Sequence, residues 1–369
     1  MKKFLFSTTA LAVAGAFVFG ADANAAAKPI KLSVGGFMTT EWGFGDNDGT
    51  FETGGATSTT TSNKRASFNN VQDAELLFSG STKLDSGVTV SINIQIEADQ
   101  ARAGTTIDES YMKLTGAFGD LRLGSTTGTN SVLKHTAPYV GVAPDGGGSD
   151  NYITVPAAVT AGNSTNTSSS GDANKIAYIS PRVGGIALGA SYTPSTTNAD
   201  TAPVTGGNAS EGGEVLEAAI SFETTVGTSS VGADVAAESR SNGTHAYRAG
   251  LKVTAGGITA GGSVFKRLDN DGDNTATATD NNANTYDLGV SYVMGAYTFG
   301  VAKAYGERSD GDGTEDTESK WSAGMSYAID TGVTGTLTYI KADYDDGAAG
   351  AAGDDNNGHA LIGQLKVSF

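Results

Sequence analysis

Residues Val88–Glu97 read VTVSINIQIE, and apolar and polar side chains alternate at every position of this stretch. Because successive side chains of a β-strand point to opposite faces, a period of two predicts a strand with one apolar and one polar face. The alternation recurs in Trp321–Ile329 and Leu361–Phe369, among others. The chain is therefore predicted to be all-β, with about sixteen strands at residues 30–44, 67–84, 87–100, 106–117, 120–125, 174–181, 185–194, 213–224, 228–240, 244–255, 258–268, 285–294, 297–308, 318–329, 333–344 and 358–369.

The connections between these strands alternate in length. Tight turns such as 85–86, 256–257 and 295–296 alternate along the chain with a second set of connections. Most of these are long and rich in Gly, Asp, Asn and Thr, such as 126–173. All the short connections therefore lie at one end of the sheet, as the periplasmic turns of outer-membrane barrels do, with the longer loops outside the cell. A soluble sandwich has shorter strands, of about five or six residues, and no reason to sort its loops. We predict a transmembrane antiparallel β-barrel rather than a soluble sandwich or β-helix.

Composition excludes several classes of protein. The chain has 369 residues, 52 glycines, no cysteine and a formal net charge of −17. Such acidity does not suit a nucleic-acid partner, and the lack of cysteine excludes disulfides, thiol catalysis and zinc–thiolate sites. The three histidines (His135, His245 and His359) are far apart in sequence, and no serine lies in a Gly-x-Ser-x-Gly motif. We therefore expect no catalytic residues and no enzyme.

The N-terminus has the three parts of a secretory signal peptide. Lys2 and Lys3 are followed by an apolar stretch and by Ala23-Asn24-Ala25, an A-x-A cleavage site. The clean apolar run is too short to span a bilayer. We expect residues 1–25 to be removed on export and residues 26–369 to form a single barrel domain.

Three motifs carry a family resemblance. The last strand, Leu361–Phe369, ends on an aromatic residue, with apolar residues at every second position before it. Tyr111–Gly124 contains a strand, a Gly-Ala-Phe-Gly turn and a short strand ahead of a long connection, and Ala177–Pro181 carries a Tyr-Ile-Ser-Pro turn after it. In their order and spacing these motifs resemble the Gram-negative general diffusion porins, of the alphaproteobacterial type. One departure is Ser125, where the family consensus has an arginine, which leaves the local charge of the pore open.

The resemblance implies a trimeric outer-membrane pore for the passive diffusion of ions and small hydrophilic solutes. It implies that the third loop folds inward, and that Phe369 belongs to the signal read by the barrel assembly machinery. The implied surroundings are outer-membrane lipid and lipopolysaccharide. A barrel that serves mainly as a surface-binding or adhesion protein through its long loops remains the alternative.

The third loop corresponds to residues 126–173, the longest connection. A connection of this length without strands is usually functional or disordered. It contains apolar side chains that could pack against a wall, among them Leu133, Val140 and Tyr152, and it carries Asp145 and Asp150 near its middle. We expect it to fold into the barrel as a constriction.

Strand phase predicts which charges face the lumen. Lys113 and Arg122 alternate with leucines, so both should point inward. If Asp145 and Asp150 face this wall, the four residues set up a transverse field that tunes ion preference. Lys320 and Lys366 should also point inward, as solvated charges without a special role. The acidic excess favours a mild cation preference.

Acidic connections at 269–273 and 310–312 offer the candidates for a bound ion. Asp269, Asp271 and Asp273 place oxygens at alternating positions, as calcium sites do, but the glycine spacing does not match the helix–loop–helix calcium motif. A solvated acidic loop is the simpler interpretation, and Ca²⁺ at the outer rim is the other. No cofactor is expected to be required.

Overall fold

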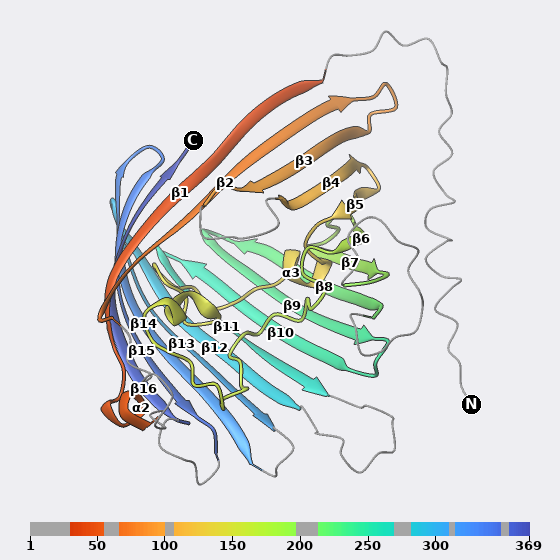
Figure 1. The fold of residues 1–369 in the computed structure, drawn as a ribbon. Coiled ribbons are helices and arrows are strands. Elements are labelled where there is room, and N and C mark those ends of the chain that lie inside the picture. Colours follow the sequence, from red (N-terminus) through yellow and green to blue (C-terminus); the bar gives the residue numbers. More distant parts are fainter. Residues whose placement is uncertain are drawn as a thin grey trace, which may run out of the picture.

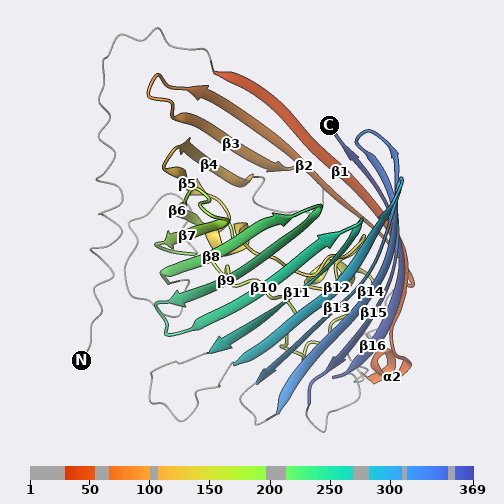
Figure 2. The same cartoon turned by 180° about the vertical axis from the view of Figure 1, so that it is seen from behind.

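The computed structural model describes residues 30–54, 66–99, 107–196, 213–268, 282–309, 314–347 and 354–369. Within these ranges sixteen antiparallel strands form one closed barrel, in which each strand pairs with its neighbours in sequence and β1 pairs with β16 (Figures 1 and 2). The predicted transmembrane β-barrel is therefore confirmed. The signal peptide expected at residues 1–25 and the acidic residues Asp269, Asp271 and Asp273 lie outside the described residues.

The observed strands agree with the predicted ones to within a few residues. They are β1 (Lys31–Asp46), β2 (Phe68–Lys83), β3 (Thr89–Glu97), β4 (Ile107–Gly116), β5 (Gly119–Ser125), β6 (Asn174–Ile179), β7 (Ile186–Thr193), β8 (Val215–Val226), β9 (Ser229–Arg240), β10 (His245–Ala255), β11 (Ile258–Leu268), β12 (Ala283–Met294), β13 (Tyr297–Ser309), β14 (Glu315–Asp330), β15 (Val333–Asp345) and β16 (Asn356–Ser368).

Three short helical segments were not predicted from the sequence. They are α2 (Gly49–Gly54), α3 (Thr129–Val132) and the 3-10 turn η1 (Gly147–Asn151). Each lies in a long connection whose sequence has no helical hydrophobic periodicity that would predict it. None of the helices in the described ranges is long and apolar enough to cross a bilayer.

The two faces of the strands differ as the alternation requires. Along β14, the inward Asp316, Glu318 and Lys320 are buried, while the outward Trp321 and Met325 are exposed. Large apolar side chains are exposed in the same way on the outside of nearly every strand. Lipid or a neighbouring subunit must cover this apolar surface, so the core of an ordinary soluble protein is turned inside out here.

The chain end closes the barrel. The backbone N–H of Phe369 donates to the carbonyl of Gly36 at 3.0 Å, and the N–H of Gly36 donates to the carbonyl of Phe369 at 3.1 Å. These two bonds extend the β1–β16 ladder by one residue at the end that carries the short turns. The Phe369 side chain itself is 70% exposed.

A variant that lacks Phe369 should reach the outer membrane at a clearly lower level although its synthesis is unchanged. It loses both closing hydrogen bonds and the terminal aromatic ring. Immunoblots of outer-membrane and whole-cell fractions measure the ratio. Phe369→Tyr, which keeps the ring and the backbone, is the matched control and should behave like the parent. Equal levels for all three proteins would contradict a role in assembly.

Candidate functional site

Residues 126–173, called the inner loop below, connect β5 and β6 and lie inside the barrel (Figure 1). Their apolar side chains pack on the inner wall at two places. Leu133 contacts the small residues Ala187, Ala219 and Ala236 of β7, β8 and β9. Tyr152 and Ile153 join the buried side chains of β15 and β16, including Ile340 and Ile362. The apolar residues of the inner loop are therefore used for packing, and the loop lines one side of the channel.

Glycines on the inner faces of the strands let the inner loop lie directly on the wall. A Cβ at Gly250 of β10 would overlap the carbonyl oxygen of His135, and one at Gly289 of β12 would overlap that of Pro138. Gly324 of β14 stands in the same relation to the carbonyl of Val140. As the loop advances, it therefore crosses successive strands at positions without side chains. We call these three residues the glycine track.

Carboxylates of the wall accept hydrogen bonds from the backbone of the inner loop. A loop without a ladder must find acceptors for its buried N–H groups, because leaving one unsatisfied costs about 1–3 kcal/mol. In the described part of the chain, six carboxylates of β4, β8, β9, β12 and β14 accept such bonds at 2.6–3.2 Å, and we call these the anchor carboxylates. They are Glu109 (from Thr127 N–H, 2.7 Å), Glu217 (Asn130, 3.2 Å), Asp234 (His135, 2.6 Å), Asp287 (Ala137, 2.9 Å), Asp316 (Thr160, 2.6 Å) and Glu238 (Ser169, 2.7 Å).

Arg248 joins the outgoing and returning halves of the inner loop. Its Nη2 donates to the carbonyl of His135 at 2.9 Å, and its Nε donates to the carbonyl of Thr165 at 3.0 Å. Its Nη1 forms an ion pair with Asp234, and both side chains are almost completely buried. Removing either partner would leave the other charge buried and unpaired.

Lys320 holds the far end of the inner loop. Its Nζ lies 2.9 Å from Asp150 and 2.6 Å from Glu318, and it also donates to the carbonyl of Gly146 at 3.1 Å. The expectation that Lys320 is a solvated charge without a role is therefore wrong. Sequence phase placed it inward but could not show that the inner loop would cover it.

The expected arrangement of the loop aspartates is also corrected. Asp150 does not face Lys113 and Arg122, because it is bound to Lys320 of β14. Asp145 is half-buried on the same side, and burial raises the pKa of its carboxyl group. The Asp287 carboxylate acts in the same direction, while Lys134 and Lys320 oppose it. The four predicted residues thus divide between two sides of the lumen.

Lys113 and Arg122 lie on the part of the wall formed by β2–β5, which we call the open wall. They are partners in the β4–β5 register and point inward, as predicted. Both are half-buried, and the Arg122 guanidinium lies 5.7 Å from the centre of the Tyr111 ring. The open wall therefore carries two neighbouring cations.

The same wall carries a group of acids. Asp73, Glu75 and Glu97 have carboxylate oxygens within 4.8 Å of one another. The amide of Gln95 donates to Glu75 at 2.6 Å and to Asp108 at 3.2 Å. The sequence did not predict this group of acids, because the register between β2 and β3 cannot be read from strand phase alone.

Two side chains of the inner loop were not predicted to face the lumen, and one of them, Tyr139, was expected to pack against the wall with the other apolar residues of the loop. Lys134 and Tyr139 are exposed although they belong to a segment inside the barrel, so they face its water. No residue pattern marks them. The path of the loop did leave one trace in the sequence. Glycine occupies inward-facing positions of β10, β12 and β14, the three residues of the glycine track.

Comparisons with known proteins agree with this geometry. The profile of the Gram-negative porin family matches residues 7–350. Among solved structures, an anion-selective porin from Comamonas acidovorans superposes with a TM-score of 0.62 at 16% identity, covering 92% of this chain and 100% of that one. The outer-membrane protein OmpT of Vibrio cholerae in its trimer form (0.61, 9% identity, 93% and 100%) and the outer-membrane channel DcaP of Acinetobacter baumannii (0.58, 13%, 92% and 97%) are also similar. At these identities the likeness concerns the fold. No curated protein matches the sequence.

The glycine track yields a prediction about the channel width. Gly289→Ala and Gly324→Ala should each push the inner loop toward the open lumen, because the new methyl group overlaps a loop carbonyl and neither glycine needs a positive φ. We expect lower single-channel conductance and noisier current in planar bilayers. Gly49→Ala, where nothing lies within 4 Å of the added atom, is the matched control. Parental conductance in both track variants would mean that the loop does not rest on this wall.

Proposed function

The chain belongs to the Gram-negative porin family, and from this membership we propose how its channel filters solutes. The protein is an outer-membrane porin whose water-filled channel serves the passive diffusion of ions and small hydrophilic solutes. The observation that carries the proposed filter is the inner loop, which is held mainly on the β7–β16 side of a closed barrel and leaves Lys113 and Arg122 of the open wall partly exposed. The adhesion alternative finds no support in the comparisons. Family and fold are those of channels, and we propose that the protein catalyses no reaction.

The proposed solute path runs between the inner loop and the open wall. Lys113 and Arg122 border it on one side, and Asp145 and the exposed Lys134 border it on the other. Asp150 contributes less to the field, because its charge is offset by the ion pair with Lys320. In a channel narrower than the Debye length of about 8 Å, charges on both sides act on a passing ion. The acids of the open wall support a mild preference for cations.

Reversal potentials across a KCl gradient test this filter. Lys113→Gln combined with Arg122→Gln should move selectivity toward cations, and Asp145→Asn should move it toward anions. Asp150→Asn should shift it less than Asp145→Asn does. The shifts should shrink at high salt because screening increases.

The matched control is Lys341→Gln, which removes the same charge from the outside of the barrel and should change nothing. If no lumen variant shifts the potential at low salt, the proposed path does not pass these residues. Conductance of the parent protein in the same experiment separates that result from the absence of a channel.

We also propose that the porin is a homotrimer in the outer membrane, surrounded by lipid and lipopolysaccharide and delivered by the barrel assembly machinery. The family supports this, and a trimer form is the one described for the similar Vibrio cholerae protein. The exported chain is proposed to begin at Ala26, after removal of residues 1–25. The calcium site at Asp269, Asp271 and Asp273 stays a prediction from the sequence.

The oligomeric state has a direct test. The detergent-extracted protein should have three times the chain mass by light scattering, and unheated samples should migrate on denaturing gels differently from boiled ones. Boiled samples should run near the mass of one chain, because heat separates and unfolds the barrels. A single-chain mass before heating would refute the trimer without touching the barrel. Mass spectrometry of the same sample reads the first residue of the mature chain.

A further inference from the structure

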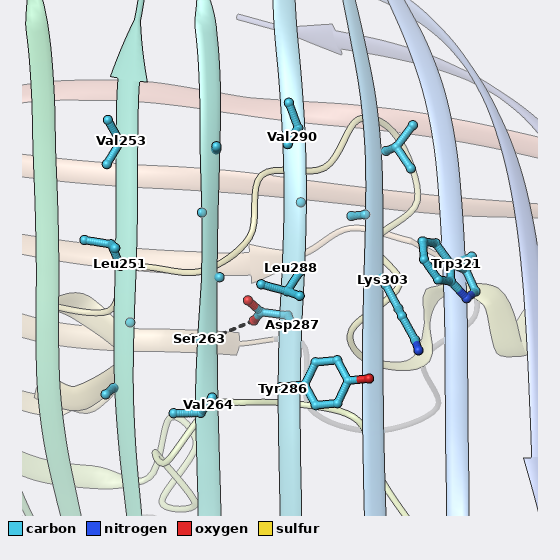
Figure 3. A pocket seen from close by; sticks show the side chains of 18 residues that line it. Leu251, Val253, Ser263, Val264, Tyr286, Asp287, Leu288, Val290, Lys303 and Trp321 are labelled. Atoms are coloured by element: carbon cyan, nitrogen blue, oxygen red, sulfur yellow. Dashed lines mark hydrogen bonds between the residues drawn. The ribbon is translucent and has the colours of Figure 1, made fainter.

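A groove lies on the outer, lipid-facing surface of the barrel across β10–β14 (Figure 3). It has a volume of about 940 Å³. Its floor follows β11, where Ala260 and Gly262 present almost no side chain to the outside. In the register, Gly262 lies between Leu251 and Leu288, and the next outward row toward the short turns places Ala260 between Val253 and Val290. The groove is therefore long, apolar and parallel to a strand, as an acyl chain requires.

One end of this groove carries a lysine that faces outward. Lys303 of β13 is the register partner of Leu288 on one side and of Trp321 on the other. Its Nζ lies 5.2 Å from the centre of the Trp321 ring, 5.6 Å from that of Tyr286 and 5.7 Å from that of Tyr305. In Figure 3 the amine points away from Val290 and toward the side of Tyr286, which is the end of the barrel with the long loops. Among the described residues it forms no ion pair with a carboxylate.

The position of Lys303 coincides with the edge of the apolar band. Toward the short turns, the outward residues of its neighbourhood are Val301, Val290 and Ala323. Toward the long loops they become polar, with Glu307 on the same strand and Asn284 beside it, and these two are bonded to each other at 2.9 Å. A lysine is strongly unfavourable at the bilayer midplane but nearly neutral near the interface, so its location fits the boundary of the outer leaflet.

Aromatic rings at the same level support this placement. Tyrosine and tryptophan form girdles at the interfaces of outer-membrane barrels. The rings around Lys303 attract its ammonium group, yet their faces cannot accept all three of its N–H bonds as an oxygen anion would. A phosphate oxygen on the open side would satisfy the donors that remain.

We propose that this groove binds an outer-leaflet lipid with a phosphorylated headgroup. One acyl chain lies along β11 over Gly262 and Ala260, and the phosphate accepts hydrogen bonds from Lys303. Charge complementarity carries the choice of occupant: Lys303 is the one cation among the residues that line the groove, and a second exposed lysine, Lys266, follows Val264 on β11 at the same end. The proposal rests on the outer-membrane placement stated above, and it adds a lipid site that lies apart from the solute path.

Quenching of tryptophan fluorescence by brominated lipid tests the site. The chain has two tryptophans, so a Trp42→Phe background leaves Trp321 beside the groove as the single reporter. Phosphatidic acid with brominated acyl chains, titrated into the detergent-solubilised protein, should quench Trp321 in a saturable manner. Brominated phosphatidylcholine, whose phosphate is capped by choline, should bind more weakly.

Two variants separate the headgroup from the chain. Lys303→Gln should weaken the apparent affinity for phosphatidic acid about tenfold and remove the preference over phosphatidylcholine. Ala260→Leu, which fills the floor between Val253 and Val290, should weaken both lipids alike. The matched control is Lys341→Gln, which removes a charge on the other side of Trp321, outside the groove, and should leave the affinity unchanged.

Each other outcome overturns the proposal. Quenching that rises linearly with lipid and is identical in all variants would show general contact with the micelle. Protection of Trp321 that disappears only when the oligomer dissociates would show that a second copy of the chain covers the groove. Single-channel conductance of every variant is recorded in parallel. Parental conductance without saturable quenching rejects the lipid site alone, whereas absent conductance in the parent would reject the porin function.

Discussion

The structure depends on hydrogen-bond acceptors for the backbone N–H groups of the inner loop, because this segment has no partner strand to provide them. The inner loop crosses the barrel without a regular partner strand, and its N–H groups cannot reach bulk water where it lies against the wall. The anchor carboxylates solve this problem from β4, β8, β9, β12 and β14. Hydrogen bonds to a charged acceptor contribute about 1.5–3 kcal/mol each, so several together can hold a long loop in one place.

The size of the inward side chains on the wall is also determined by the inner loop that packs against them. Where the inner loop passes closest, as at Gly250 and Gly324, even a methyl group would collide with a loop carbonyl. Where the loop needs apolar contact, the wall offers small residues such as Ala187 and Ala219 for Leu133. The high glycine content is thus partly a consequence of fitting a second layer of chain inside a barrel.

Local periodicity was enough to predict the strands and their faces, and this is why Lys113 and Arg122 could be placed inward. The two-residue period of apolar and polar side chains belongs to each strand alone, so it can be recognised without knowing which strands are its neighbours. The partners of Asp150 and Asp145 could not be predicted in this way. They depend on which strand lies across the lumen, and the inner loop has no period that would reveal its path. For the same reason, strand phase placed Lys320 in the lumen but could not predict its ion pair with Asp150 of the inner loop.

The formal charge of −17 overstates the field that an ion meets in the channel. Asp234 is paired with Arg248, Glu318 and Asp150 share Lys320, and the anchor carboxylates direct lone pairs at backbone dipoles of the inner loop. These acids are used to hold the structure, and each is offset by a cation or an N–H dipole within hydrogen-bond distance. Selectivity therefore depends on the small remainder that reaches water: Asp73 and Glu75 of the open wall, its two cations, and the exposed charges of the loop. For this reason the acidity of the whole chain gives only a weak indication of which ion the channel prefers.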